Sequence, residues 1–156
     1  MKKFSLTDLL IFIVSAELVG AFSALLSGGF TDIYNRLTRP PFSPPAAVFP
    51  IVWTVLYALM GISAYLVWRT DTSASRRALG VYAIQLAINF SWSIVFFRFE
   101  ALLAAAIVAV LLLAAVGSMV WSFFGVNKKA AYLQLPYLAW SLFAAYLAAG
   151  TYLLNR

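Results

Sequence analysis

Long hydrophobic runs separated by short polar breaks make up almost the whole chain. The runs cover about residues 7–27, 47–69, 77–98, 101–124 and 130–154. A helix of about 20 apolar residues crosses the hydrocarbon core of a bilayer, and each run reaches that length. The pattern therefore predicts an all-α membrane protein built as a bundle of five transmembrane helices in a single domain, residues 1–156.

The break at residues 28–46, called the lid below, is much longer than the others. Loops beyond about 12–15 residues are uncommon unless they are functional or disordered. Pro40-Pro41 and Pro44-Pro45 stiffen this one, because proline fixes φ and disfavours helix at the residue before it. We expect an ordered cap on the bundle, with a short helix at Thr31 to Leu37 capped by Thr31 or Asp32.

The second run begins with an aromatic face directly beneath the lid. Phe49, Trp53 and Tyr57 follow one another at spacings of four, which places three rings on one side of a helix. Pro50 falls in the first turn, where a missing N–H costs little. The segment predicts a proline-stiffened lid that runs into an aromatic wall.

Composition agrees with a membrane protein and excludes most catalytic chemistry. The chain is 64% hydrophobic and 10% charged, whereas soluble domains are roughly 45–50% apolar and about 25% charged. Histidine and cysteine are absent, which excludes imidazole catalysis, thiolate chemistry and disulfides. No carboxylate pair has the spacing of a hydrolytic dyad, so we predict no catalytic residues and no metal site.

The net charge of +6 reflects basic anchors in the loops rather than nucleic-acid binding. Four basic residues lie on the side of the lid: Arg36, Arg39, Arg98 and Arg156. Seven lie on the other side: Lys2, Lys3, Arg69, Arg76, Arg77, Lys128 and Lys129. The excess predicts a cytoplasmic N-terminus and a lid on the opposite side of the membrane.

Glu17 is the one acidic residue well inside an apolar run. The run is longer than the ~7–15 residues of a signal-peptide core, so we interpret it as a membrane span rather than a cleaved signal. Gly20, Ala21 and Ala24 share the face of Glu17, and their small size lets a neighbouring helix approach. Glu17 is either functional or a protonated side chain bonded to that neighbour.

Polar and small residues mark the inner faces of the later helices. Gln85, Asn89 and Trp92 lie on one face, which must point into the bundle. Their amides either join helices or orient a ligand. Ala101, Ala105 and Ala109 form a stripe suited to packing or to a subunit contact, and Pro136 is expected to kink the last helix.

Tryptophans on three different helices point to a cavity below the lid. Trp53 and Trp92 fall in the half of the membrane next to the lid, and Trp140 falls nearer the midplane. A stripe of aromatic residues on one helix is usually core. Three helices that each contribute a tryptophan, with Gln85 and Asn89 between them, favour a ligand site.

Several segments resemble the translocator protein family, also called tryptophan-rich sensory proteins or peripheral benzodiazepine receptors. They are Tyr34 with Leu37, RPPFSPPAAVFPIVWTVLYALMG (39–61), QLAINFSW (85–92) followed by VFF (95–97), and LPYLAWSLFA (135–144). The resemblance covers nearly the whole chain in the right order, and the proline-rich and PYLAW segments are specific.

The resemblance implies a commonly dimeric five-helix bundle whose pocket is closed by the loop between the first two helices. Family members bind porphyrins and haem-related tetrapyrroles, and some bind sterols or benzodiazepine-type drugs. By motif position the ligand-binding residues are Tyr34, Pro44, Trp53, Tyr57, Asn89, Trp92, Trp140, Phe143, Ala144 and Leu147. Trp53 and Trp140 match the tryptophans tied in the family to light-dependent porphyrin breakdown.

Four positions depart from the family pattern: Ile33, Val108, Ala148 and Tyr152. The last two disturb the sterol motif of some relatives, and the loose cholesterol pattern from Leu147 to Arg156 matches by chance too easily to be informative.

The expected function is a membrane receptor or transporter-like protein that binds tetrapyrroles, with membrane lipid and a second copy of the chain as partners. Metal-free protoporphyrin IX is the favoured ligand because no histidine can bind haem iron. It would stack on Trp53 and Trp140 and direct its carboxylates to Arg36 or Arg39. The first alternative is light-dependent porphyrin degradation, and the second is a sterol-binding protein or a scaffold.

Overall fold

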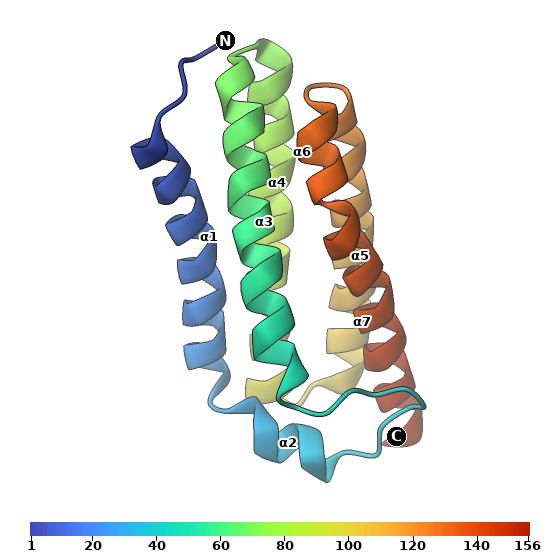
Figure 1. Ribbon diagram of the computed structural model, residues 1–156. Helices are drawn as coiled ribbons and strands as arrows, with labels where there is room; N and C mark the ends of the chain where they lie inside the picture. Colours follow the sequence, from blue (N-terminus) through green and yellow to red (C-terminus); the bar gives the residue numbers. More distant parts are fainter.

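The computed structural model describes residues 1–156 and contains only helices (Figure 1). Five helical spans are long and apolar enough to cross a membrane, as predicted. The first two are α1 (Leu6–Ser27) and α3 (Val48–Thr70), and the fourth is α5 (Leu102–Phe124). The third joins α4 (Ser73–Ser93) to the π-helical turn η1 (Ile94–Arg98), and the fifth joins α6 (Lys128–Leu133) to α7 (Leu135–Leu154).

Two of the predicted helix boundaries are wrong. The third span begins at Ser73 rather than at residue 77, because the Thr72 hydroxyl accepts from the Ser75 N–H and the Ser75 hydroxyl accepts from the Thr72 N–H. The fifth span is interrupted at Gln134 instead of running unbroken from residue 130. Pro136 therefore lies in the first turn of α7 and begins a helix, where we had expected it to kink one.

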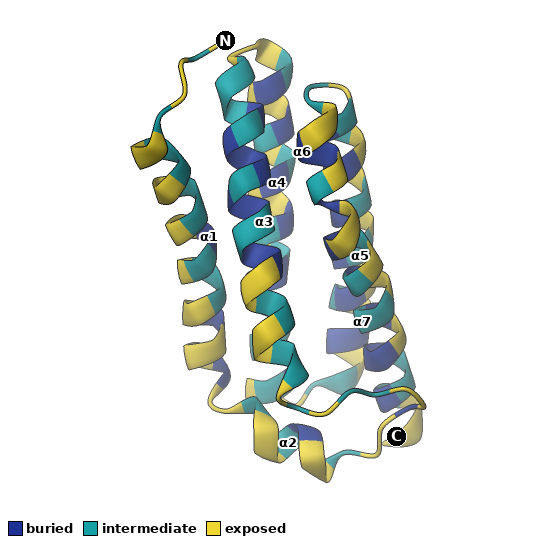
Figure 2. Ribbon diagram, viewed as in Figure 1, coloured by how far each residue is buried: buried dark blue, intermediate teal, exposed yellow.

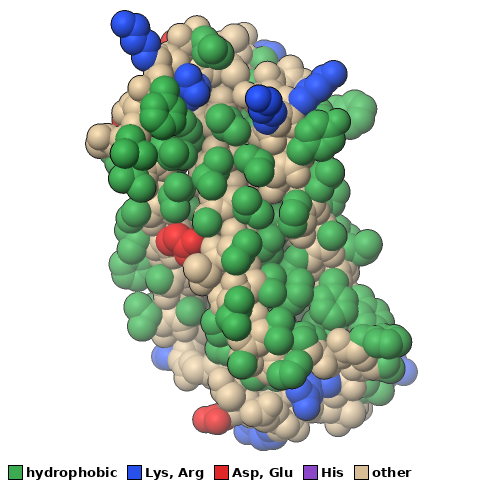
Figure 3. Space-filling model, in the orientation of Figure 1, with side chains coloured by type: hydrophobic (Ala, Val, Ile, Leu, Met, Phe, Trp, Pro, Cys, Tyr) green, Lys and Arg blue, Asp and Glu red, His purple; other side chains and the backbone are tan.

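The helices pack so that α1 lies against α3 and α4, while α5 lies between α4 and α7. Buried residues line the inner sides of the long helices (Figure 2). The largest core cluster fills the half of the bundle away from the lid, around Met60, Met119 and Phe123. Hydrophobic side chains cover the middle of the surface seen in Figure 3, and basic side chains gather toward its ends, as expected for a protein that spans a bilayer.

The alanine stripe of α5 packs inside the chain. Ala105 and Ala109 are 0% and 3% exposed, and Ala109 lies in a cluster with Ala145 and Ala148 of α7. Of the two interpretations, packing is the one that the structure bears out, because this side of α5 is covered by its own neighbours.

The lid contains a short helix, α2 (Phe30–Arg36), followed by an extended segment that crosses the end of the bundle (Figure 1). Gly28 and Gly29 turn the chain into α2 with positive φ angles of 79° and 97°, which glycine adopts without strain. The helix is close to the predicted one, but its cap is Gly29 and no side chain bonds the helix start. Thr31 and Asp32 are therefore not caps.

The middle of the lid is fastened to the bundle on two sides. Arg36 donates two hydrogen bonds to the Glu100 carboxylate, at 2.9 and 2.8 Å. Two residues further on, Thr38 N–H donates to Asn155 Oδ1 (3.0 Å), and Asn155 Nδ2 donates to the carbonyl of Thr38 (2.7 Å). Tyr146 also donates to the carbonyl of Pro41. The lid is thus held between the start of α5 and the end of α7.

Candidate ligand cavity

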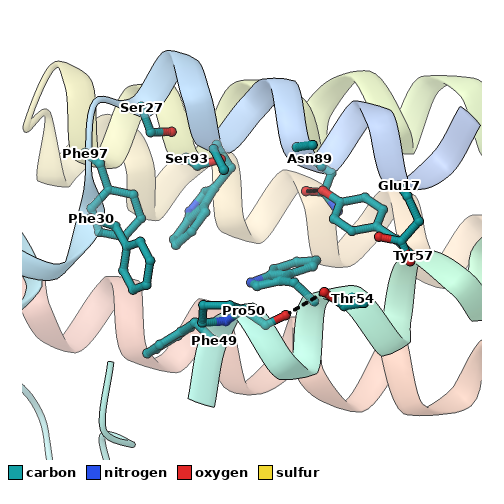
Figure 4. A pocket seen from close by; sticks show the side chains of 15 residues that line it. Glu17, Ser27, Phe30, Phe49, Pro50, Thr54, Tyr57, Asn89, Ser93 and Phe97 are labelled. Carbon is teal, nitrogen blue, oxygen red and sulfur yellow. Dashed lines mark hydrogen bonds between the residues drawn. The ribbon is translucent and has the colours of Figure 1, made fainter. Parts of the chain in front are cut away.

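A cavity of about 260 Å³ lies between α1, α3 and α4 in the half of the bundle next to the lid (Figure 4). Its lining consists of aromatic, small and a few polar residues: Glu17, Gly20, Ala21, Ala24, Ser27, Phe30, Phe49, Pro50, Trp53, Thr54, Tyr57, Asn89, Trp92, Ser93 and Phe97.

Aromatic rings make most of the walls. The spacing of four along α3 places Phe49, Trp53 and Tyr57 in one wall, as the sequence predicted. Phe30 of α2 closes the lid end, where its ring lies 6.4 Å from that of Phe49 and 5.8 Å from that of Phe97. The cavity is therefore suited to a flat apolar ligand that stacks on aromatic faces.

A hydrogen-bonded network joins three helices at the inner end of the cavity. Tyr57 OH donates to Asn89 Oδ1 (3.0 Å), and Asn89 Nδ2 donates to Tyr137 OH (2.6 Å). Tyr137 OH in turn donates to Gln85 Oε1 (2.8 Å). Gln85 and Asn89 thus join α4 to α3 and α7, which is the first of the two roles considered for them. Asn89 also lines the cavity.

Most other polar groups of the lining are also bonded within the protein. Ser27 donates to the carbonyl of Ser23, Thr54 donates to that of Pro50, and the Trp92 indole N–H donates to that of Ala105. The hydroxyl of Ser93 pairs with that of Ser23.

Two polar groups of the lining have no partner in the protein. The carboxylate of Glu17 and the indole N–H of Trp53 take part in none of the hydrogen bonds or ion pairs of the chain. The sequence left two interpretations of Glu17, a functional residue or a side chain bonded to a neighbouring helix. The structure does not contain that bond. An acceptor and a donor therefore remain available to a ligand.

The structure divides the cavity that the three tryptophans predicted. Trp53 and Trp92 line the cavity, whereas Trp140 and Phe143 line a more open groove of about 470 Å³ between α3 and α7. The two hollows lie on opposite faces of α3: residues 49, 50, 53, 54 and 57 face the cavity, and residues 51, 52, 55 and 56 face the groove. The Phe49 ring of the cavity wall meets the Trp140 ring edge-on at 5.9 Å.

Comparison with known proteins identifies the family. The model of the TspO/MBR family matches residues 10–153. The chain belongs to the TspO/MBR family. It is 35% identical to the tryptophan-rich protein TspO of Archaeoglobus fulgidus over 150 residues, which cover 89% of this chain and 97% of the relative.

Two further relatives extend the range of organisms. Protein CrtK of Rhodobacter capsulatus is 32% identical over 97% of this chain and 94% of its own length. The translocator protein of Ovis aries is 40% identical over 73% of this chain and 69% of its own length. The resemblance inferred from the sequence motifs is confirmed, and the chain is an integral multi-pass membrane protein of the TspO/MBR family.

The remaining residues expected at the site of this TspO/MBR protein do not line the cavity. Tyr34 is buried on the inner side of the lid, where its hydroxyl donates to the carbonyl of Pro44 (2.6 Å) and its ring meets Phe49 at 5.0 Å. The bond joins two parts of the lid, and the ring contact holds the lid against the aromatic wall. Ala144 and Leu147 on α7 line neither hollow.

Sequence reasoning missed several lining residues, including Ser27, Phe30 and Phe97. Phe97 belongs to the VFF segment that carried part of the resemblance, and it faces the cavity because α4 ends in the π-helical turn η1. Such turns inside helices are frequent at functional sites. The small residues of α1, Gly20, Ala21 and Ala24, form the cavity wall opposite α3, and their shared face was visible in the sequence.

The chemistry available in the cavity is that of binding. No group of three His, Cys, Asp or Glu side chains comes together to hold a metal ion. Glu17 is the only carboxylate in the lining, so the paired acid and base of general acid–base catalysis are not assembled there. What the cavity offers a ligand is aromatic surfaces for stacking and two unpaired polar groups, the carboxylate of Glu17 and the indole N–H of Trp53.

Proposed function

We propose that this TspO/MBR protein binds porphyrins and related tetrapyrroles in the membrane, as a receptor or transporter-like protein, and that the aromatic cavity beneath the lid is the site. The observation that carries the proposal is the pair of indole rings, Trp53 and Trp92, in a lining that also holds the rings of Phe30, Phe49, Tyr57 and Phe97. A flat macrocycle gains from such surfaces by stacking and by leaving water.

A macrocycle requires the cavity to widen. Ligand sites usually measure about 300–1,000 Å³, and the cavity, at about 260 Å³, falls below that range. The edge-on contact between Phe49 of the cavity wall and Trp140 of α7 is one that can open. Losing such a contact costs about 0.5–1.5 kcal/mol, which stacking on the ligand replaces.

The lid supplies the positive charge for the carboxylates of the ligand. Arg36 is already engaged with Glu100, so Arg39 is the better candidate of the two arginines considered. Its guanidinium lies 4.7 Å from the centre of the Tyr34 ring and forms no ion pair. A macrocycle inserted from the lid side leaves its carboxylates within reach of this group.

Metal-free protoporphyrin IX is the ligand of choice. No histidine exists to bind haem iron. The only hydroxyl group with acidic character in the lining, that of Tyr57, is occupied by Asn89.

The N-terminus is on the cytoplasmic side in this proposal, with the lid on the opposite side. The N-terminus and the turns after α3 and α5 lie at one end of the bundle, and the lid and C-terminus lie at the other (Figure 1). The first end carries seven basic residues and the second carries four, and cytoplasmic ends are the more basic.

A titration with protoporphyrin IX tests the site. The affinity is measured from the Soret band of the porphyrin in detergent micelles, for the wild type and for two double variants. Trp53→Phe with Trp92→Phe replaces both cavity indoles by smaller rings without the N–H and is expected to weaken binding severalfold, since aromatic pairs contribute about 0.5–1.5 kcal/mol beyond the area they bury.

The control replaces tryptophans outside the cavity, Trp68→Phe with Trp121→Phe. Trp121 is 81% exposed, and Trp68 packs under Lys2 at the opposite end of the bundle. Equal affinity of the two double variants would show that the site lies elsewhere. Illumination of the same samples tests the degradation alternative, which requires Soret absorbance to fall faster with wild type than with the Trp53→Phe variant.

A further inference from the structure

Glu17 lies deep in the membrane and faces the cavity. It stands near the middle of α1, about 15 Å from either end at 1.5 Å per residue. Its side chain is half-buried and lines the cavity with Gly20, Ala21 and Ala24 from the same face of the helix. Figure 4 shows it at the same end of the cavity as Tyr57.

The protein provides no partner for this carboxylate. The two salt bridges of the chain are Lys2–Asp71 and Arg36–Glu100, which lie at the ends of the bundle. The nearest hydroxyl on the facing helix belongs to Tyr57, whose ring rests against Gly20, and it donates to Asn89. Glu17 is therefore an unpaired acceptor in the cavity lining, and its side chain is only partly buried.

An unpaired carboxylate at this depth is unfavourable, because hydrocarbon solvates charge poorly. Such residues are retained where a counter-charge or a hydrogen-bond donor reaches them. No group of the protein does so here, and a ligand in the cavity lies within reach because Glu17 is part of the lining. The unpaired indole N–H of Trp53 adds a donor to the same cavity, so the ligand is expected to carry an acceptor as well.

We propose that Glu17 makes the cavity selective for ligands that present a protonated amine or another N–H donor on an aromatic body. The proposal rests on the same cavity as the proposed function and names the ligand chemistry that it recognises. A carboxylate placed at the same depth is rejected. Aromatic walls favour cations further through their π faces.

Three naphthyl probes of equal length test the selectivity on the wild-type protein. They carry a two-carbon arm that ends in an ammonium, a hydroxyl or a carboxylate group. Binding is measured by isothermal titration calorimetry in non-ionic micelles, with protein-free micelles as the blank. We expect the amine to bind about 10- to 100-fold more tightly than the alcohol, as for a hydrogen bond to a charged group, and the carboxylate to bind most weakly.

Equal affinities of the three probes, or tightest binding of the carboxylate, would overturn the proposal without any variant. Glu17→Gln is expected to reduce the affinity for the amine to that for the alcohol. The control Asp32→Asn removes the same charge from an exposed position on α2 and is expected to leave the amine unaffected. Full amine affinity in Glu17→Gln would also overturn the proposal.

Protoporphyrin IX, titrated into the same variants, separates this proposal from the tetrapyrrole function. Selective amine binding without porphyrin binding would refute the proposed function and support the role of Glu17. Porphyrin binding in a protein that does not distinguish the three probes would support the function and refute the role of Glu17.

Discussion

Polar side chains inside the membrane-spanning helices are used here in two ways. Gln85, Asn89 and Tyr137 bond to one another across three helices, so each satisfies the others in a medium without water. Glu17 and the Trp53 indole N–H remain unbonded on the cavity wall. The first arrangement stabilises the bundle, and the second gives the cavity its chemical character.

Removal of the Tyr137 hydroxyl tests the first arrangement. Tyr137→Phe leaves Asn89 Nδ2 and Gln85 Oε1 buried without this partner, and an unpaired buried polar group costs about 1–3 kcal/mol. We expect the free energy of unfolding to fall by that amount, measured by titration with a denaturing detergent in mixed micelles. Tyr132→Phe is the matched control, because Tyr132 is 59% exposed. Equal stability of the two variants would contradict the role of the network.

Among the helices, close packing depends on individual glycines. Gly61 of α3 lies against the backbone of α1, where a methyl group would come within 2.7 Å of the carbonyl oxygen of Phe12. Backbone cannot rotate away as a side chain can, so Gly61→Ala must push α1 outward. This contact also holds the α1 wall of the cavity in place.

Gly61→Ala is expected to lower the free energy of unfolding by about 1–3 kcal/mol, as overpacking does. Gly80→Ala adds the same methyl group to α4, where no atom lies within 4 Å, and should raise stability by roughly 0.5–1 kcal/mol through helix propensity. The same mixed-micelle titration compares both variants with wild type. If the two substitutions changed stability in the same direction, the close approach of α1 and α3 would not be important.

The hydrogen bonds that hold the lid against the bundle are expected to affect the rates of ligand binding and release. Asn155 bonds Thr38 twice, so Asn155→Ala frees the middle of the lid from the end of α7 while leaving the cavity residues in place. Porphyrin is expected to associate and dissociate severalfold faster, because covering segments limit exchange of ligands. Stopped-flow absorbance measures both rates. Asn35→Ala on α2 is the control, since the Asn35 side chain makes none of the lid's hydrogen bonds. Unchanged rates in Asn155→Ala would show that the bonds between Asn155 and Thr38 do not limit ligand exchange.

The sequence was sufficient for the five spans because hydropathy is summed over about 20 residues and single errors average out. The sequence predicted less well those features that depend on a single side chain, such as the exact start of a helix. Thr72 and Ser75 moved a helix start by four residues, and Gln134 interrupted the last span. The separation of the cavity from the groove depends on which face of α3 packs beside α1 and α4 and which beside α7, and no linear pattern encodes this. Trp140 was therefore expected in the same hollow as Trp53.

As a whole, the molecule has two chemically different ends joined by an apolar band. An odd number of spans puts the N-terminus and the C-terminus at opposite ends (Figure 1), and the more basic end contains the N-terminus. In the proposed orientation, a ligand that enters beneath the lid would reach the cavity from the side away from the cytoplasm, where the arginines of the lid would meet its carboxylates.

Because the chain has no cysteine, this orientation is testable with single introduced thiols. Asn35→Cys on α2 and Lys129→Cys on α6 both place a thiol at an exposed position, at opposite ends of the bundle. A membrane-impermeant maleimide added to intact cells is expected to label the first, and to label the second only after permeabilisation. Labelling in the reverse order would place the lid in the cytoplasm. The excess of basic residues at the N-terminal end would then not determine the orientation.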